Sequence, residues 1–189
     1  MQPFWQWLAE VDAQNDVVEW ARPYEADLPK LWRECPRGDW LLAIAARLGA
    51  ERNALVSAAC RCARLSLAHL PEDEGRPEDG LEAAEAWSTG EGDAEACGEH
   101  KDAISQALDE AADPATGAAI IASMSALDAI DDPDAAANAA SFAIQAAVLD
   151  AGDCAMMEAM RFAQRRSAQL VREAISADDI DALWPQERA

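Results

Sequence analysis

The sequence predicts an all-α fold: one domain over residues 1–189, with about eight or nine helices packed as a bundle or as an irregular array of helical hairpins. Apolar residues recur three and four positions apart over long stretches, which is the spacing of one helix face, while the two-residue alternation of strands is almost absent. Alanine, the strongest helix former, supplies close to half of the hydrophobic residues. A chain of 189 residues can also bury a sizeable core without disulfides or a metal ion.

Capping residues mark where the predicted helices begin. The start signals are an aspartate before a proline or an apolar run, and a serine or aspartate followed three residues later by an acidic residue. They occur at Asp16 to Glu19, Asp39, Asp113-Pro114, Asp132-Pro133 and Ser176 to Asp179. Proline and glycine predict the breaks, at Pro23, 36–38, Gly49, 71–77, 88–92, 113–114, 131–133 and Gly152. The segment from Ala135 to Leu149 is apolar almost all round, so we expect it at the centre of the domain.

The chain carries 15 Lys and Arg against 36 Asp and Glu, a formal net charge of -21. Nucleic acids and anionic membranes attract proteins chiefly through Lys and Arg, so this charge argues against both as partners. No basic leader precedes an apolar stretch at the start, and no run reaches the ~20 apolar residues that span a bilayer. We therefore expect a soluble, cytoplasmic protein whose five cysteines are reduced, free thiols.

The charge divides the chain into three parts. Residues 1–71 hold five of the seven tryptophans and a nearly balanced set of 9 acidic and 8 basic residues. Residues 72–134 form an acidic middle, with 19 acidic and 2 basic residues, and residues 135–189 hold 8 and 5. A middle part with a net charge of -17 attracts basic partners and repels acidic ones.

The sequence contains no glycine-rich phosphate loop, dinucleotide fingerprint, nucleophile elbow or zinc-protease helix. Only His69 and His100 are available as general bases near neutral pH, and both fall near predicted helix ends or exposed faces. Cys60 and Cys62 would project about 200° apart on a helix, which argues against a shared metal ion. The segment 128–134 lacks the glycine and glutamate of a calcium loop. We expect no enzymatic activity, metal or cofactor, although a carboxylate pair inside the bundle stays open as the enzymatic alternative.

Two groups of large apolar residues have a structural and a functional interpretation. Met156, Met157 and Met160 lie at helical spacing beside Phe162, and we expect them to fill the core rather than to form a pliable binding surface. Tryptophan is costly to expose and valuable in an interface. We expect most of the N-terminal tryptophans to clamp short helices onto the body, while one or two could anchor a partner: Trp5, Trp7, Trp20, Trp32 and Trp40.

Several segments resemble one known family. They read Leu31-Trp32-Arg33-Glu34-Cys35-Pro36-Arg37-Gly38-Asp39-Trp40-Leu41-Leu42, Ala45-Ala46-Arg47-Leu48-Gly49 and Ala59-Cys60-Arg61-Cys62-Ala63-Arg64, followed by Arg76-Pro77 and Ala84-Glu85-Ala86-Trp87-Ser88-Thr89-Gly90. In these segments the chain is similar to the alanine-rich helical immunity proteins of bacterial polymorphic-toxin systems, the fifth in the numbered series of immunity families. The motif residues of this resemblance are Trp32, Cys35, Pro36, Arg37, Gly38, Asp39, Trp40, Arg47, Arg64 and Trp87.

The resemblance implies a protein that binds a toxin, made by the same cell or delivered by its kin, and blocks it. It supplies no catalytic residue, and the acidic middle departs from the family pattern, so the identity of the toxin does not follow. A toxin that cleaves nucleic acid has a basic cleft, which an acidic helical surface would occupy in place of phosphate. We expect the toxin-facing surface to include seven carboxylates: Glu82, Glu85, Glu91, Asp93, Glu95, Glu99 and Asp102.

Other interpretations of the same residues stay open. The acidic residues would also keep a helical domain soluble without any partner. Five charged residues in and after the motif would form a network that fixes the helix register: Arg37, Asp39, Arg47, Arg61 and Arg64. The alternative function is a helical scaffold or regulator that grips another protein through a tryptophan-rich surface. The sequence leaves the oligomeric state unknown.

Overall fold

The computed structural model describes residues 2–11, 13–25 and 27–184, and this part of the chain is all-α, as predicted. These residues form ten α-helices, two short 3-10 helices and no strand, so the helix count is slightly above the eight or nine expected. The α-helices are α1 (Phe4–Glu10), α2 (Asn15–Ala21), α3 (Leu28–Glu34), α4 (Gly38–Leu48), α5 (Arg52–Ala63), α6 (Arg76–Thr89), α7 (Ala94–Asp109), α8 (Pro114–Asp128), α9 (Ala135–Ala174) and α10 (Ala177–Leu183). The 3-10 helices are η1 (Arg22–Tyr24) and η2 (Arg64–His69).

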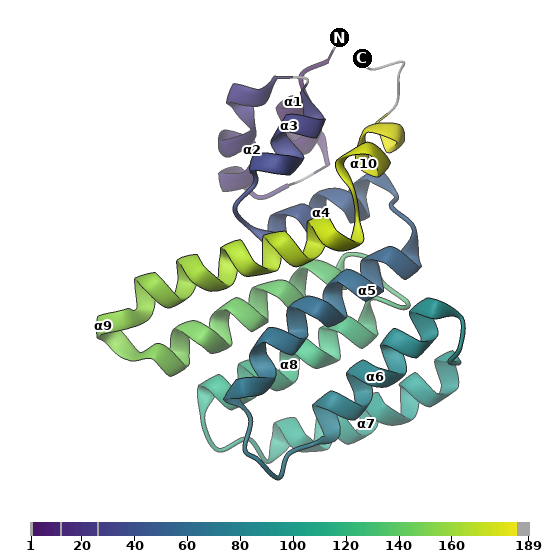
Figure 1. Ribbon diagram of the computed structural model, residues 1–189, viewed down its shortest axis with the longest axis vertical. Helices are drawn as coiled ribbons and strands as arrows, with labels where there is room; N and C mark the ends of the chain where they lie inside the picture. The colour runs from purple at the N-terminus through teal and green to yellow at the C-terminus, as the bar shows by residue number, and fades with distance from the viewer. Residues whose placement is uncertain (1, 12, 26, 185–189) are drawn as a thin grey trace.

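The helices are stacked from one end of the molecule to the other (Figure 1). Helices α1, α2 and α3 lie at one end together with α10, and the pair α6 and α7 forms the opposite end. Between them, α9 packs against α4, α5 and α8. The apolar segment from Ala135 to Leu149 therefore lies between other helices, as predicted, although its end at Leu149 is exposed. No helix of the described residues is both long enough and apolar enough to cross a membrane.

Helix α9 is a hairpin rather than one straight rod. Gly152 interrupts it with φ 64° and ψ 175°, a backbone conformation that is open essentially only to glycine. The residues on either side, 135–151 and 153–174, form two arms that lie next to each other in Figure 1. We call them the first and second arm of α9. The break predicted at Gly152 is confirmed.

Two predicted helix starts are confirmed by their capping hydrogen bonds. Asp113 accepts hydrogen bonds from the backbone N–H groups of Ala115 and Thr116, at 2.9 and 3.0 Å, and α8 begins directly after it. These bonds, with one from the Thr116 hydroxyl, hold the pKa of the Asp113 carboxyl below its usual range. Ser176 and Asp179 form a reciprocal capping box at the start of α10.

Two other predicted starts are wrong. Helix α2 begins at Asn15, so Asp16 lies inside its first turn and does not cap it. Helix α9 begins at Ala135, and Asp132 instead accepts a hydrogen bond from the N–H of Asp134, at 3.0 Å, in the preceding turn. The carboxylate of Asp132 binds an N–H group of the turn, although the sequence pattern assigns it to the helix.

The tryptophans join the two ends of the described chain. Trp184 packs against Phe4 and Trp7 of α1, with ring centroids 5.0 and 5.4 Å apart. Trp32 of α3 is fully buried, and its Nε1 donates a hydrogen bond to the carbonyl oxygen of Ile175 at 3.1 Å. All five N-terminal tryptophans lie in the core or pack against it, which confirms their clamping role.

The prediction that the methionines and Phe162 fill the core is wrong. Met156, Met157 and Phe162 are 38%, 55% and 65% exposed, Leu149 across the turn is 43% exposed, and only Met160 is partly buried. Leu149, Met156 and Met157 lie within five residues of Gly152, at the turn of α9, and Phe162 lies further along the second arm. The turn lies at the edge of the molecule in Figure 1. The helical spacing identifies the helix, but it does not tell where the neighbouring helices end.

Four of the five cysteines are buried as free thiols, as expected, and Cys154 at the turn of α9 is exposed. Burial favours the uncharged thiol over the thiolate. It raises the pKa of Cys35 and of Cys62 to about 12, and it also raises the pKa of Cys60. These thiols therefore act as small apolar groups in the core rather than as reactive centres.

Gly38 is the point at which α4 approaches the second arm of α9 most tightly. Its N–H lies 3.3 Å from the hydroxyl oxygen of Ser167, and a Cβ on Gly38 would lie 2.6 Å from the backbone carbonyl carbon of that residue. A side chain at this position would force the two helices apart. The requirement for glycine here is steric, since two backbones occupy the space.

We expect Gly38→Ala to lower the free energy of unfolding by about 1–3 kcal/mol, because the added methyl group overpacks this contact. Chemical denaturation followed by circular dichroism measures the change. Gly98→Ala in α7 is the matched control, since a Cβ there meets nothing within 4 Å. The control should be neutral or more stable by up to about 1 kcal/mol. A Gly38→Ala protein as stable as the parent would contradict the close approach.

The buried thiols predict a loss of stability at alkaline pH. The unfolded thiols ionise near pH ~8.5, whereas in the folded protein the pKa values of Cys35 and Cys62 are about 12. The unfolded state therefore loses protons first, and the free energy of unfolding falls as the pH rises from about 8.5 through about 12. Urea titrations at several pH values should show a shallower fall for Cys62→Ala. A Cys62→Ala protein with the same slope as the parent would contradict this role of the buried thiol.

Candidate functional site

The motif residues from Trp32 to Trp40 lead the chain from α3 into α4. Helix α3 ends before Pro36, and the preceding Cys35 is buried. Arg172 on the second arm of α9 donates a hydrogen bond to the carbonyl oxygen of Cys35 at 2.8 Å. The first half of the motif thus fixes the path of the chain against α9.

Arg37, Asp39 and Trp40 form a cluster at the start of α4. The Nε of Arg37 donates to Oδ1 of Asp39 at 3.1 Å, and a second guanidinium N–H binds the other carboxylate oxygen. The same guanidinium lies over the indole ring of Trp40, 4.4 Å from its centroid. Asp39 is only 8% exposed. The prediction that Asp39 caps α4 is wrong, because α4 already begins at Gly38 and Arg37 holds the carboxylate.

Arg47, another motif residue, connects α4 to two other segments. Its Nε donates a hydrogen bond to the carbonyl oxygen of Val11, and its Nη1 donates one to the carbonyl oxygen of Ala43, both at 3.2 Å. Nη1 also lies 3.8 Å from a carboxylate oxygen of Asp134, just before the first arm of α9. Arg47 therefore links the α1–α2 connection, α4 and α9.

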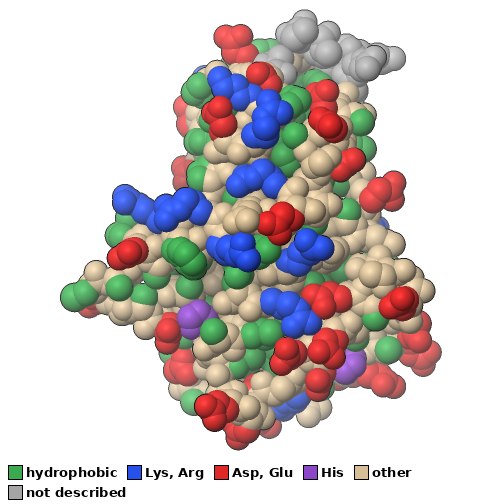
Figure 2. Space-filling model, in the orientation of Figure 1, with side chains coloured by type: hydrophobic (Ala, Val, Ile, Leu, Met, Phe, Trp, Pro, Cys, Tyr) green, Lys and Arg blue, Asp and Glu red, His purple; other side chains and the backbone are tan. Residues whose placement is uncertain are grey.

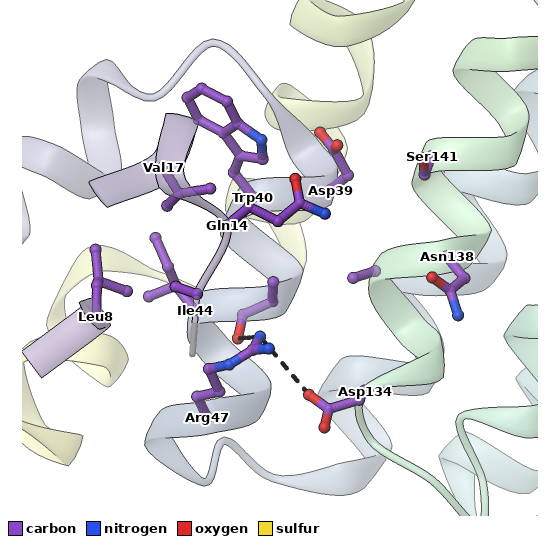
Figure 3. Close-up of a pocket in the computed structure, with 13 residues that line it drawn as sticks. Leu8, Gln14, Val17, Asp39, Trp40, Ile44, Arg47, Asp134, Asn138 and Ser141 are labelled. Atoms are coloured by element: carbon purple, nitrogen blue, oxygen red, sulfur yellow. Dashed lines mark hydrogen bonds and ion pairs between the residues drawn. The ribbon is translucent and has the colours of Figure 1, made fainter. Parts of the chain in front are cut away.

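Three of these motif residues, Asp39, Trp40 and Arg47, line a pocket of about 280 Å³ between α2, α4 and the first arm of α9 (Figure 3). Apolar side chains form one part of its wall, and neutral polar side chains form much of the rest. The apolar residues are Leu8, Ala13, Val17, Trp40, Ala43, Ile44 and Ala137, and the polar and charged ones are Gln14, Asp39, Arg47, Asp134, Asn138 and Ser141.

Trp40 places an unused hydrogen-bond donor at this pocket. The ring is 8% exposed, and its Nε1 is buried with no hydrogen-bond partner among the described residues. In Figure 3 the edge of the ring that carries the nitrogen is turned toward Asp39 and Gln14, on the pocket side. A buried donor without a partner costs about 1–3 kcal/mol, so an acceptor at this place would stabilise the protein.

The five charged residues predicted to form one network, Arg37, Asp39, Arg47, Arg61 and Arg64, do not do so. Those that form ion pairs do so separately. Arg37 binds Asp39, Arg47 lies near Asp134, and Arg64 of η2 binds Glu78 and Glu85 of α6. Arg61 is exposed. Each pair joins neighbouring elements locally, so the helix register is fixed at several places rather than by one shared network.

Two of the seven predicted partner-binding carboxylates have structural roles. Glu85 accepts hydrogen bonds from Nε and Nη2 of Arg64, at 2.8 and 2.9 Å. Asp93 caps α7 by accepting a hydrogen bond from the N–H of Ala96 at 2.8 Å. Trp87, in the same helix as Glu85, is partly buried against the core. The motif residues Arg64 and Trp87 therefore hold α6 in place.

Three of the predicted carboxylates share one face of α7. Glu95, Glu99 and Asp102 are four and three residues apart, so they project within roughly 60° of one another around the helix axis. All three are exposed, and the buried residues of α7 lie on the opposite side: Cys97, Ile104 and Ala107. We call these three carboxylates the α7 stripe. Glu91 is exposed in the loop just before α7.

Glu82 does not belong to this stripe. Gly80 faces α7, because a Cβ there would lie 2.5 Å from Cδ1 of Ile104. Glu82 follows two residues later and therefore projects about 200° away, on the side of α6 remote from α7. The structure thus separates the predicted toxin-facing residues into a set on α7 and a set on α6.

The two basic residues of the acidic middle are both engaged in ion pairs within it. Arg76 at the start of α6 binds Glu74 and, at 2.7 Å, Glu110 after α7. Hydrogen bonds from Arg76 hold the pKa of Glu74 below its usual range. Nζ of Lys101 in α7 lies 3.2 Å from a carboxylate oxygen of Asp128, the last residue of α8, and 3.2 Å from one of Asp131, just after α8. The ion pairs of Arg76 connect α6 with α7, and those of Lys101 connect α7 with α8. The carboxylates of the α7 stripe have no ion-pair partner within the described residues.

The surface charge is divided accordingly. On the face shown in Figure 2, the end formed by α6 and α7 carries mostly acidic side chains, while across the middle and toward the opposite end Lys and Arg are mixed with acidic side chains. A strong field of one sign at one end of a small protein orients an approaching partner of the opposite sign.

The sequence carried no signal for the pocket as a whole. Asn138 and Ser141 come to face α4 only through the packing of α9, about a hundred residues along the chain from Asp39. No group of three or more His, Cys, Asp and Glu side chains in residues 2–11, 13–25 and 27–184 is placed to hold a metal ion. A comparison of the chain with protein-family models, curated proteins and solved structures found no match.

We expect Asp39→Ala to lower the free energy of unfolding by about 1–3 kcal/mol, because it leaves the Arg37 guanidinium without its carboxylate. Chemical denaturation measures the change. Glu19→Ala is the matched control, since it breaks an exposed pair with Arg22 at 2.9 Å and should cost at most about 1 kcal/mol. Equal losses in the two variants would show that the Arg37–Asp39 pair has no special role.

Proposed function

We propose that this chain is an immunity protein that binds a basic toxin and neutralises it by covering the toxin's active cleft with the acidic end formed by α6 and α7. The observation that carries the proposal is the α7 stripe. Glu95, Glu99 and Asp102 point away from the core and form no ion pair within the described residues. Exposed carboxylates on a rigid helix are arranged before the partner arrives, which lowers the cost of binding.

The charge of the surrounding segment supports this proposal. Residues 72–134 carry a net charge of -17, and both of their bases are bound in ion pairs of their own. No base of this segment is therefore left to offset the stripe. Such a field raises the rate at which a basic partner associates and disfavours acidic partners.

Neutralisation by occlusion requires binding but no chemistry. Successive carboxylates of the α7 stripe are about 4.5–6 Å apart along the helix axis and so form a row of negative charge over two helical turns. A cleft that binds the phosphates of a nucleic acid presents Lys and Arg to such a row. The resemblance of residues 31–90 to helical immunity proteins agrees with this role.

A second candidate function, that of a helical scaffold or regulator, is favoured by a different observation. The tryptophans are turned inward and offer little surface for a partner. Instead, the exposed large apolar side chains of the described residues lie on α9 between residues 149 and 162, on both sides of its turn: Leu149, Met156, Met157 and Phe162. Methionine and aromatic residues are enriched in the centres of protein interfaces. A partner held there would be insensitive to salt, because apolar contacts are weakly screened.

The test is calorimetric titration of this protein with the product of the neighbouring reading frame, at low and at high salt. We expect one-to-one binding that weakens at least tenfold, roughly, when the salt concentration is raised severalfold. Replacing the stripe by Glu95→Gln, Glu99→Gln and Asp102→Asn should weaken binding by a similar factor at low salt. The same variant should fail to inhibit the activity of that product.

The matched control removes the same charge elsewhere, by Glu51→Gln, Asp178→Asn and Asp181→Asn, all at exposed positions. Equal effects of the two triple variants would show that only the overall charge matters and would contradict a specific stripe. An affinity that does not change with salt concentration and is lost in Phe162→Ser would instead support the scaffold function, with the partner bound to the exposed apolar residues of α9.

A further inference from the structure

The pocket beside the motif is not used by the proposed function. It lies between α2, α4 and the first arm of α9, whereas the α7 stripe lies at the far end of the molecule (Figure 1). Its volume of about 280 Å³ is just below the ~300–1,000 Å³ of most small-molecule sites. The pocket therefore fits a group the size of one amino-acid residue rather than a nucleotide or another large cofactor.

The apolar part of the pocket selects for an apolar group. Leu8, Val17 and Ile44 line it, and each is at most 4% exposed, so they belong to the core and stay in place when a ligand enters. An aliphatic or aromatic side chain that packs against them is removed from water. This stabilises the complex in proportion to the apolar area that is buried.

The charges at the pocket select against a charged group. Asp39 is paired with Arg37, and Arg47 lies 3.8 Å from Asp134, so the two carboxylates and the two guanidinium groups offset each other. An ion that entered would lose its hydration without gaining an unpaired opposite charge. The occupant is therefore uncharged.

The polar groups of the pocket fit an amide. The buried Nε1 of Trp40 needs an acceptor, and an amide carbonyl supplies one. Gln14, Asn138 and Ser141 are exposed at the rim and offer donors and acceptors for the remaining N–H and C=O groups of a peptide. Gln14 and Trp40 both line the pocket, and Gln14 is exposed, so its side chain can rotate when a ligand enters.

We propose that this pocket binds one uncharged, apolar residue of a partner's peptide segment. Its side chain lies against Leu8, Val17 and Ile44, and its backbone amide is bound by Trp40 and Asn138. This site is independent of the α7 stripe, so its test and the test of the immunity function can fail separately.

The experiment is a titration of the ¹⁵N-labelled protein with N-acetyl-L-leucinamide, followed by the indole N–H signals in ¹H–¹⁵N NMR spectra. The signal that Trp40→Phe removes identifies Trp40. We expect it to shift in a saturable manner, with a dissociation constant on the order of millimolar for so small a ligand. N-acetylglycinamide, which lacks the side chain, should bind about tenfold more weakly or worse. N-acetyl-L-lysinamide, which carries a charge, should also bind more weakly.

Two variants separate binding from folding. Asn138→Ala changes an exposed rim residue and should weaken the binding of N-acetyl-L-leucinamide at least threefold while the other indole signals stay in place. Gln145→Ala is the matched control, because this residue is also exposed on the first arm of α9 but does not line the pocket. It should leave the affinity unchanged.

Three results would overturn the proposal. The first is a Trp40 signal that does not shift when N-acetyl-L-leucinamide is added. The second is an equal shift with the glycine and lysine compounds. The third is tighter binding of free L-leucine than of N-acetyl-L-leucinamide. The last result would identify a site for a free amino acid rather than for a residue within a peptide.

Discussion

The close seating of α4 on the second arm of α9 is the constraint on which the rest of this structure depends. Gly38 meets the backbone of Ser167, and Arg172 reaches back to the carbonyl oxygen of Cys35. These contacts set the direction in which α4 leaves the motif. The direction of α4 in turn places Asp39, Trp40 and Arg47 at the pocket between α2 and the first arm of α9. The motif from Trp32 to Trp40 therefore has a structural role, because it connects α4 to the second arm of α9.

Much of the fold follows from short-range patterns in the sequence. The spacing of apolar residues indicates the helices, the caps at Asp113 and Ser176 form as their local sequence requires, and Gly152 breaks α9 where the glycine stands. These signals succeed because both partners of each interaction lie within four residues of each other. The central place of the first arm of α9 follows from the composition of the segment itself, since a helix that is apolar almost all round is expected to be buried on most sides.

The sequence fails where a competing contact, or a residue distant in the chain, decides the outcome. Asp39 does not cap α4, because its carboxylate binds Arg37, whose guanidinium lies over the ring of Trp40. Glu85 binds Arg64 of η2 and so holds two helices together instead of facing a partner. The exposure of Phe162 depends on where the neighbouring helices end. The carboxylates of α6 and α7 look equivalent along the chain, yet the packing of Gly80 against α7 turns them to different sides.

The contact between Trp32 and Ile175 joins residues 143 positions apart, and Trp184 closes over α1 beyond it. A growing chain on the ribosome makes α1, α2 and α3 early but cannot complete the burial of Trp7 and Trp32 until Ile175 and Trp184, on either side of α10, have emerged. During synthesis these helices therefore present a large apolar surface, of the kind that chaperones bind. Formation of this end of the molecule is a late event, and a translational pause before α10 would prolong the interval in which the nascent protein can aggregate.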